Sequence, residues 1–199
     1  EIKKLDDLGF SNQVIAGLMP NIDGSKILGR AKTLRLRELK EGEDFTGIYK
    51  ALQSYKTIIP NDVIIVDNEV PSYAYFGELN ASLALRSGAA GAIINGMTRD
   101  SNAVKSMNLP VFSLGNACQD VRKRATLDSI NKTINLNGVT IKSGSLVFAD
   151  GEGIVVIPKE VEDSVINKVL EIVKKEKNMI ANIAEGIDVD TLVEKYGFF

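Results

Sequence analysis

Hydrophobic and polar positions predict an alternation of strands and helices in the first part of the chain. Short apolar runs rich in β-branched residues are typical of buried strands, and the Leu-Arg alternation at 34–37 is typical of a half-buried strand. The predicted strands are 25–39, 62–68, 91–95 and 109–115. The predicted helices are 13–20, 45–55, 77–87 and a segment from Asp100 or Ser101 to 107. This order favours a partly parallel sheet with helices packed on it.

The pattern changes after residue 133. Residues 133–158 show period-two patterning broken by Gly and Ser, which predicts β-hairpins. Apolar residues then recur at helical spacing as far as Gly186, a typical helix stop, and a final short helix is expected over 189–199. Because no repeat or linker is visible, we expect one domain, 1–199, whose C-terminal helices occupy 159–199.

Composition is that of a soluble globular protein. The chain has 199 residues, of which 44% are hydrophobic and 25% charged, and its net charge is −2. This balance gives no global attraction to nucleic acid, and the basic run 121–124 is more typical of a solvated face. No run is long enough to span a membrane, and no signal peptide is recognisable. The single cysteine, Cys118, is expected to be packed or buried, and we expect a cytoplasmic location.

The sequence contains no histidine, which narrows the available chemistry. Histidine is the commonest general base near neutral pH and the commonest metal ligand. Proton transfer would therefore depend on carboxylate, Lys, Tyr, Cys or metal-bound water. A metal ion held by side chains would be a hard cation on oxygen ligands.

The segment 77–100 brings together residue types that suit an acidic ligand. Gly77 and Glu78 precede or begin a predicted helix, whose free backbone N–H groups attract anions. Arg99 and Asp100 follow the next predicted strand, where ligands bind in open α/β sheets. An arginine can grip a carboxylate with two hydrogen bonds, and an adjacent aspartate can bind a divalent cation. The simpler alternative is a solvated turn in which Asp100 caps a helix.

A known family carries these residues in the same arrangement. One motif is an acidic residue, twenty intervening positions and Arg-Asp, here Glu78 and Arg99-Asp100. The other matching segments are GRAKT (29–33), NDVIIVD (61–67), GAAGAIINGMTRD (88–100), LPVFSLG (109–115) and IKSGSLVFADGEGIVVIP (141–158). Together they resemble the family of the 4-hydroxy-4-methyl-2-oxoglutarate aldolases and the regulator of ribonuclease activity A. The chain departs from the pattern at Glu78 and Asn95, which replace Asp, and at Ser143 and Ser145, which replace Pro and Asp.

The resemblance implies a fold and an assembly. The fold would be a compact αββα sandwich of the α/β class, similar to the swivelling phosphohistidine domain, with C-terminal helices. The assembly would be a homotrimer or a hexamer. Family aldolases use a carboxylate from a neighbouring subunit's C-terminal helix, and Glu176 matches it best by its distance from Gly186. An exposed glutamate on a charged helix face explains Glu176 equally well.

The resemblance also implies a site and a reaction. Asp100 and water would hold Mg²⁺ or Mn²⁺, while Arg99 and the backbone N–H groups near Leu79 and Asn80 would bind the carboxylate of a small 2-oxo acid. Gly77, which has no side chain, would permit a close approach of the ligand to the backbone. Glu78, or a water that it orients, would act as the base. The metal would stabilise the pyruvate enolate left by cleavage of a C–C bond.

Three functions are therefore open. The first is a divalent-metal-dependent lyase, either an aldolase for substrates like 4-hydroxy-4-methyl-2-oxoglutarate or an oxaloacetate decarboxylase. The second is a non-catalytic regulator that binds a ribonuclease or another protein partner. The third is a sensor that binds the same small molecules without turnover. Retention of Arg99 and Asp100 favours the first.

Overall fold

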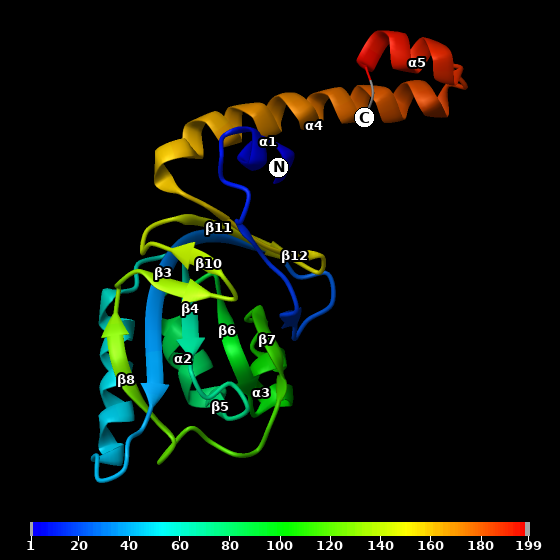
Figure 1. Ribbon diagram of the computed structural model, residues 1–199. Coiled ribbons are helices and arrows are strands. Elements are labelled where there is room, and N and C mark those ends of the chain that lie inside the picture. Colours follow the sequence, from blue (N-terminus) through cyan, green and yellow to red (C-terminus); the bar gives the residue numbers. More distant parts are fainter. Residues whose placement is uncertain (1, 198–199) are drawn as a thin grey trace.

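A computed structural model, in which residues 2–197 are described, has four layers in the order α, β, β, α (Figure 1). The strands are β1 (Val14–Ile15), β2 (Met19–Pro20), β3 (Ile27–Glu38), β4 (Asp62–Asn68), β5 (Ala74–Phe76), β6 (Gly91–Thr98), β7 (Val111–Asn116), β8 (Ala125–Ile130), β9 (Ile134–Leu136), β10 (Val139–Ile141), β11 (Leu146–Asp150) and β12 (Gly153–Ile157). The α-helices are α1 (Ile2–Asp7), α2 (Glu78–Arg86), α3 (Ser101–Ser106), α4 (Glu162–Ala184) and α5 (Val189–Tyr196). Two 3-10 helices are η1 (Phe45–Thr57) and η2 (Lys159–Val161).

One mixed sheet runs through both inner layers. Its order is β1-β12-β11-β3-β4-β6-β7-β2, with β8 added to β3 and β5 added to β6. The strands β3, β4, β6 and β7 are parallel, whereas each adjacent pair in the series β1, β12, β11 and β3 is antiparallel. The strand β3 has twelve residues and joins the two parts. Its start, Ile27–Arg30, pairs with β11, while Arg30–Leu36 pairs with β4 and Leu34–Glu38 with β8.

Successive side chains of the central strands point alternately into two hydrophobic cores, one on each face of the sheet. In β4, where every residue is buried, Ile64 and Val66 face the helical layer of η1, α2 and α3. Val63 and Ile65 face the second β layer, formed by the β9–β10 hairpin with β11 and β12. A strand buried on both faces reads as a continuous apolar run, which is the pattern that predicted it.

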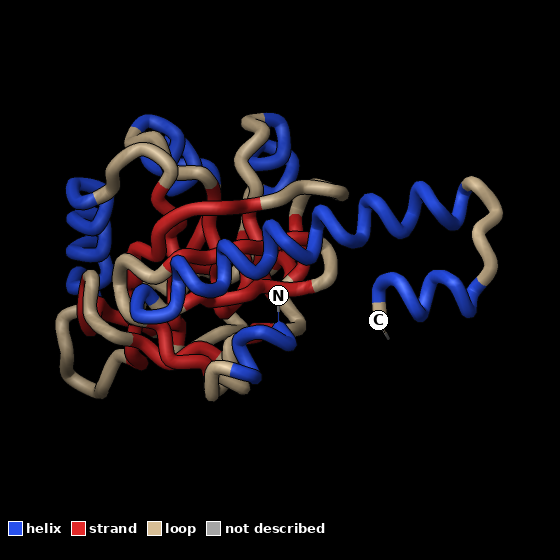
Figure 2. Tube along the Cα trace, turned by 90° about the horizontal axis from the view of Figure 1, so that it is seen from above, coloured by secondary structure: helices blue, strands red, loops and turns tan. Residues whose placement is uncertain are grey.

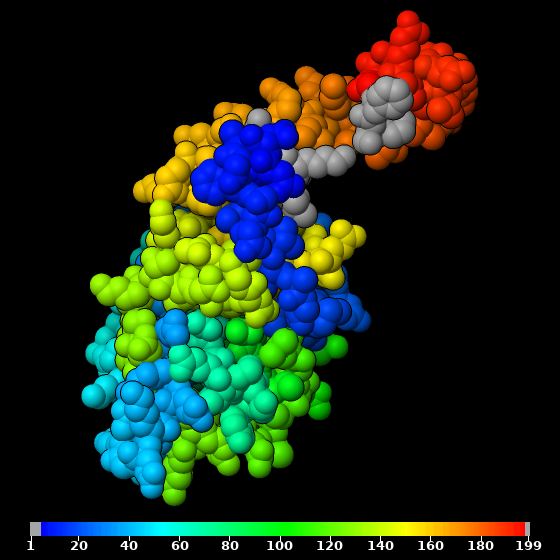
Figure 3. All heavy atoms as spheres, in the orientation of Figure 1, coloured from blue at the N-terminus to red at the C-terminus, as the bar shows by residue number. Residues whose placement is uncertain are grey.

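The start of α4, together with α1, covers the outer face of the second β layer. Val165 of α4 and Leu5 of α1 pack on Val155 and Ile157 of β12. The remainder of α4 projects beyond the sheet and carries α5 at its far end (Figures 2 and 3). No helix within residues 2–197 is long and apolar enough to cross a membrane.

Most predicted elements are present. All four strands expected between 25 and 115 are observed, as are both hairpins. The long helix starts at Glu162, after η2, and ends before Gly186, whose φ of +80° suits a glycine stop. The last helix ends at Tyr196, and residues 198–199 lie outside the described part.

The predicted helix over 13–20 is wrong. Residues Val14–Ile15 and Met19–Pro20 are instead short strands that pair with β12 and β7. Gly17 between them has a φ of +83°, which interrupts a helix. Two short strands, β5 and β8, were not predicted, because each is defined by pairing with a distant strand and has little pattern of its own.

Candidate functional site

The proposed site residues meet where two parallel strands end. The strand β5 leads into α2 and β6 leads into α3, and since β5 and β6 are parallel, both helices begin at the same edge of the sheet. Gly77 is the extended residue before α2 and is buried. A Cβ atom at Gly77 would lie 2.6 Å from Oδ2 of Asp100 and 2.9 Å from Cγ of Arg99. Only glycine therefore allows this approach.

Asp100 is turned toward α2 rather than toward its own helix. It has a left-handed backbone with φ of 56°, an uncommon conformation for a residue other than glycine, and its side chain makes no capping hydrogen bond to α3. The backbone N–H of Glu78 donates to Oδ2 of Asp100 over 3.2 Å. The Asp100 side chain therefore does not cap α3, the helix that it precedes, and instead accepts from the first N–H of α2.

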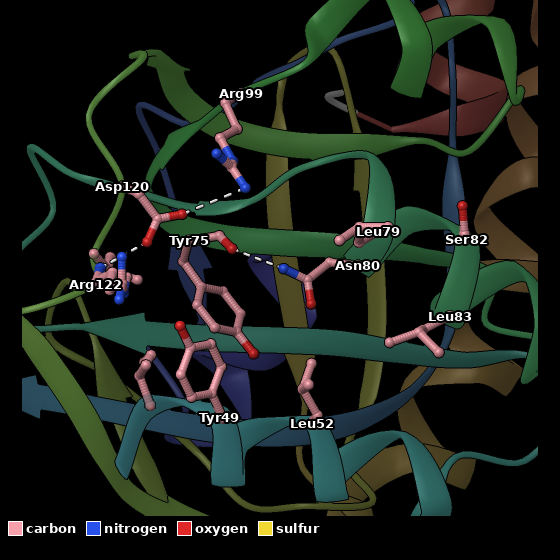
Figure 4. A pocket seen from close by; sticks show the side chains of 12 residues that line it. Tyr49, Leu52, Tyr75, Leu79, Asn80, Ser82, Leu83, Arg99, Asp120 and Arg122 are labelled. Carbon is pink, nitrogen blue, oxygen red and sulfur yellow. Dashed lines mark hydrogen bonds and ion pairs between the residues drawn. The ribbon is translucent and has the colours of Figure 1, made fainter. Parts of the chain in front are cut away.

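Arg99 is held between two carboxylates. Its Nε lies 3.7 Å from Oδ2 of Asp100, and its Nη2 lies 3.6 Å from Oδ2 of Asp120 (Figure 4). The other oxygen of Asp120 accepts a 2.6 Å hydrogen bond from the backbone N–H of Arg122. These pairs are 35–41% exposed, so water screens them and Arg99 can exchange a partner for a ligand carboxylate. Sequence reasoning missed Asp120, which belongs to no recognisable motif.

Two cavities adjoin Arg99. The smaller, of about 310 Å³, is lined by Arg99, Asp100, Asn116, Ala117 and Cys118. Cys118 is exposed there, which corrects the expectation of a buried thiol. The larger cavity, of about 660 Å³, lies between η1, α2 and segment 120–122 and includes Arg99 at its edge (Figure 4). A ligand held by Arg99 can therefore extend to either side.

The first turn of α2 supplies backbone donors beside Arg99. The first hydrogen bond of this helix runs from the Ala81 N–H to the Gly77 carbonyl, so the N–H groups of Leu79 and Asn80 have no acceptor in the helix. The Asn80 side chain is already engaged, since it donates to the Tyr75 carbonyl at 2.8 Å and accepts from the Tyr55 hydroxyl at 3.0 Å. Asn80 thus anchors α2, and its backbone is what a ligand can use.

The carboxylates of the site offer few protein ligands to a metal ion. Within residues 2–197, no group of three or more His, Cys, Asp or Glu side chains has a metal-binding arrangement. In the same part of the chain, Oδ2 of Asp100 is engaged by Glu78 and Arg99, while Oδ1 forms no hydrogen bond. Mg²⁺ commonly keeps several waters and binds through one or two carboxylates. One free oxygen at a 41% exposed side chain suits that mode.

Glu176 is not brought to this site within one chain. It is an exposed residue of α4, which packs against α1, η2 and α5 and lines neither cavity. Gly77, Glu78, Leu79 and Asn80, by contrast, all lie beside the Arg99-Asp100 turn.

Comparison with known proteins assigns the family. A family model described as RraA-like, "Aldolase/RraA", matches residues 3–156. The chain belongs to the RraA-like family. This membership confirms the resemblance found in the motifs, and with it the αββα architecture expected from them.

The RraA-like chain is similar to proteins with different names. It is 30% identical to "Protein DlpA" of Legionella pneumophila over 96% of this chain, but spans only 31% of that protein's length. It is 29% identical to "Putative 4-hydroxy-4-methyl-2-oxoglutarate aldolase" of Halalkalibacterium halodurans, over 82% of this chain and 74% of that one. Among solved structures, Streptomyces coelicolor RraAS2, described as an unusual member of the RNase ES inhibitor RraA family, superposes with a TM-score of 0.79. Its identity is 24%, over 88% of this chain and 86% of that one, which shows a shared fold.

Proposed function

We propose that this RraA-like protein is a divalent-metal-dependent lyase that cleaves a C–C bond of a small 2-oxo acid. The observation that carries the proposal is the convergence of Arg99, Asp100 and the start of α2 on one edge of the sheet, at the interatomic distances that Gly77 permits. Relatives named as aldolases support the reaction class. Aldol cleavage and oxaloacetate decarboxylation require the same two things of these residues, namely binding of the substrate carboxylate and stabilisation of a pyruvate enolate.

Arg99 and α2 would bind and orient the carboxylate of the substrate. The guanidinium offers a planar pair of N–H donors, and the N–H groups of Leu79 and Asn80 add donors at the positive end of the helix dipole. Asp120 would hold Arg99 in place before the ligand arrives. Such positioning lowers the entropic part of the barrier.

Asp100 would hold Mg²⁺ or Mn²⁺, with water completing the coordination. A bound divalent cation supplies polarisation of the 2-oxo group and stabilises the negative charge that develops when the C–C bond breaks. The Glu78 N–H keeps the Asp100 carboxylate facing the substrate side of the turn rather than the α3 backbone.

Proton transfer in aldol cleavage would use carboxylates. Glu78 is the exposed first residue of α2 and the one acidic residue of that helix. It, or a water that it orients, would accept the proton of the substrate hydroxyl. Glu176 would assist from a neighbouring copy in a homotrimer or hexamer, because it does not reach the site within one chain.

The test is pyruvate release from oxaloacetate and from 4-hydroxy-4-methyl-2-oxoglutarate. Activity should appear with Mg²⁺ or Mn²⁺ and disappear in excess EDTA. Asp100→Asn should abolish it, whereas Asp163→Asn, at an exposed residue of α4, should leave it unchanged. Full activity in EDTA, or in the Asp100 variant, would contradict the proposal.

A regulator that binds a protein partner is the second candidate. The observation in its favour is the row of exposed apolar residues on α4, together with the RNase inhibitor named among the structural neighbours. Two results together would favour a regulator over the lyase. The protein would turn over neither substrate, and it would form a complex with a protein partner that substitutions of the exposed apolar residues of α4 disrupt.

A further inference from the structure

The larger cavity extends far beyond the place where Arg99 would hold a carboxylate. Arg99 and Asp120 lie toward one end in Figure 4, while Leu52 and Leu83 line the other. Its volume of about 660 Å³ falls in the range, about 300–1,000 Å³, of pockets that enclose drug-sized ligands. A small 2-oxo dicarboxylate would leave most of this space empty.

Outside the charged side chains Arg99, Asp120 and Arg122, the wall of the cavity is mostly apolar. Leu79, Tyr49 and Leu52 are exposed to 77%, 50% and 43%, unusually high values for large apolar side chains gathered around one hollow. Ile48, Leu83 and Val121 continue the same surface. Contiguous exposed apolar surface of this kind marks a ligand or partner site. The charged groups are confined to the Arg99 side, so the cavity matches an amphipathic acid.

One buried polar group in the wall lacks a partner. Tyr75 is only 7% exposed, and its hydroxyl forms no hydrogen bond with any group in the described part of the chain. The ring points toward Tyr49 and Leu52 in the close-up, so movement of these exposed side chains would give a ligand access to the hydroxyl (Figure 4). Burial raises the pKa of Tyr75, so the hydroxyl stays protonated and can donate. Buried hydroxyls are rarely left unpaired.

We infer that the ligand of this site is a 2-oxo acid with an aromatic or branched alkyl arm that carries one oxygen. The apolar part of the arm lies in the larger cavity, and its oxygen accepts a hydrogen bond from Tyr75. The inference rests on the proposed function for the position of the carboxylate at Arg99. It adds the substrate class, since the arm distinguishes this ligand from oxaloacetate and pyruvate.

The experiment is calorimetric binding of pyruvate, phenylpyruvate and 4-hydroxyphenylpyruvate to the full chain with Mg²⁺. Burial of the ring should make phenylpyruvate bind about tenfold tighter than pyruvate, or more. The phenol oxygen should add about fivefold, which Tyr75→Phe should remove without changing the affinity for pyruvate. Leu52→Trp, which fills the cavity, should abolish the preference for both aromatic acids. Leu114→Trp is the matched control, because Leu114 is also 43% exposed but lines neither cavity.

The possible failures are distinct. Equal affinity for pyruvate and phenylpyruvate would overturn the inference, as would aromatic selectivity that neither Tyr75→Phe nor Leu52→Trp alters. Dissociation of an oligomer by Leu52→Asp, seen by sedimentation, would show that a second copy covers the cavity and would also overturn it. Selective binding of aromatic acids without any pyruvate-forming turnover would support the cavity and contradict only the proposed lyase.

Discussion

The turn at Arg99-Asp100 and the C-terminal helix α4 differ in how much of their environment one chain supplies. At the turn, Gly77 is buried against Arg99 and Asp100, and each charged side chain has a partner within 3.7 Å. In α4, by contrast, only Glu162 and Val165 of the 23 residues are buried. At the turn the charged side chains therefore have partners within one chain, whereas α4 leaves most of its side chains exposed.

The exposed apolar residues of α4 and the segment after it recur three or four positions apart in two groups. The residues are Ile166, Leu170, Val173, Ile180, Ile183 and Ile187. Such spacing places them along a stripe, which a helix normally buries. This difference predicts that substitutions at the turn change catalysis, whereas substitutions in the apolar stripe of α4 change assembly.

The largest effect is expected from Gly77→Ala. The new Cβ would displace the Asp100 carboxylate, a flexible side-chain end, so the fold should tolerate the change while the site does not. Misplacement by about 1 Å can cost roughly a hundredfold in rate, so kcat/KM should fall by about that factor. Gly151→Ala is the control, since a Cβ there meets nothing within 4 Å. Steady-state kinetics with thermal melts would check this, and wild-type kinetics in Gly77→Ala would show that the turn has no role in catalysis.

Arg99→Lys should have the next largest effect. Lysine keeps the charge but loses the two-pronged geometry for a carboxylate and the pair with Asp120. Loss of about 1.5–3 kcal/mol corresponds to a fall in kcat/KM of roughly ten- to over a hundredfold. Metal affinity through Asp100 should change little, which a Mn²⁺ titration of the same variant would measure. Arg86→Lys, at the exposed end of α2, should be silent. If both variants behave alike, Arg99 does not clamp the substrate.

Substitution in α4 tests the other side of the comparison. Leu170→Asp places a charge in the apolar stripe and should raise the dissociation constant of the oligomer by about tenfold or more. Sedimentation velocity at micromolar protein would measure this change. Asn167→Asp adds the same charge at an exposed polar position of α4 and serves as the control.

Glu176→Gln separates assembly from catalysis. It should preserve the oligomer but lower aldol cleavage by about tenfold, if a neighbouring copy uses this carboxylate. A wild-type protein that sediments as a stable monomer would contradict both α4 predictions.

The smallest effect concerns the first residue of α4. Both Nη atoms of Arg30 bond the Glu162 carboxylate, at 2.5 and 2.6 Å, and this holds the pKa of Glu162 below its usual range. Because the folded pKa is depressed, the pair stabilises the fold above the unfolded pKa of about 4.3 and loses this effect as pH falls through the folded value. Glu162→Gln should thus lower the free energy of unfolding by about 1 kcal/mol at neutral pH. The effect is modest because solvent screens the half-exposed Arg30.

In strongly acidic solution, the Glu162→Gln variant and the wild type should become equally stable. Glu160→Gln, which breaks the more exposed pair with Lys142, should have a smaller effect at neutral pH. Urea unfolding at both pH values measures the difference, and a constant difference across the pH range would exclude this ion pair as its cause.

By itself, the sequence determined the elements whose patterns are local. The apolar run of β4 and the helical spacing of α4 appear where they were predicted, because burial on both faces of a strand or on one face of a helix leaves a regular trace. The sequence also predicted that Glu78 and Arg99 lie close together. The helix α2 and the strand β6 separate them along the chain, and in a parallel arrangement the start of that helix and the end of that strand lie at the same edge of the sheet.

Tertiary structure alone decided what depends on contacts between distant segments. Gln13–Pro20 carries apolar residues that favour a helix, yet Val14 and Ile15 gain backbone partners in β12, and long-range pairing overrides a weak local preference. Asp120 reaches Arg99 only because the segment after β7 returns to β5, through the Ala74–Asp120 bridge. The unpaired Tyr75 hydroxyl is likewise invisible in sequence, since hydrogen-bond satisfaction depends on every group packed around an atom, and adjacent residues are only a few of them.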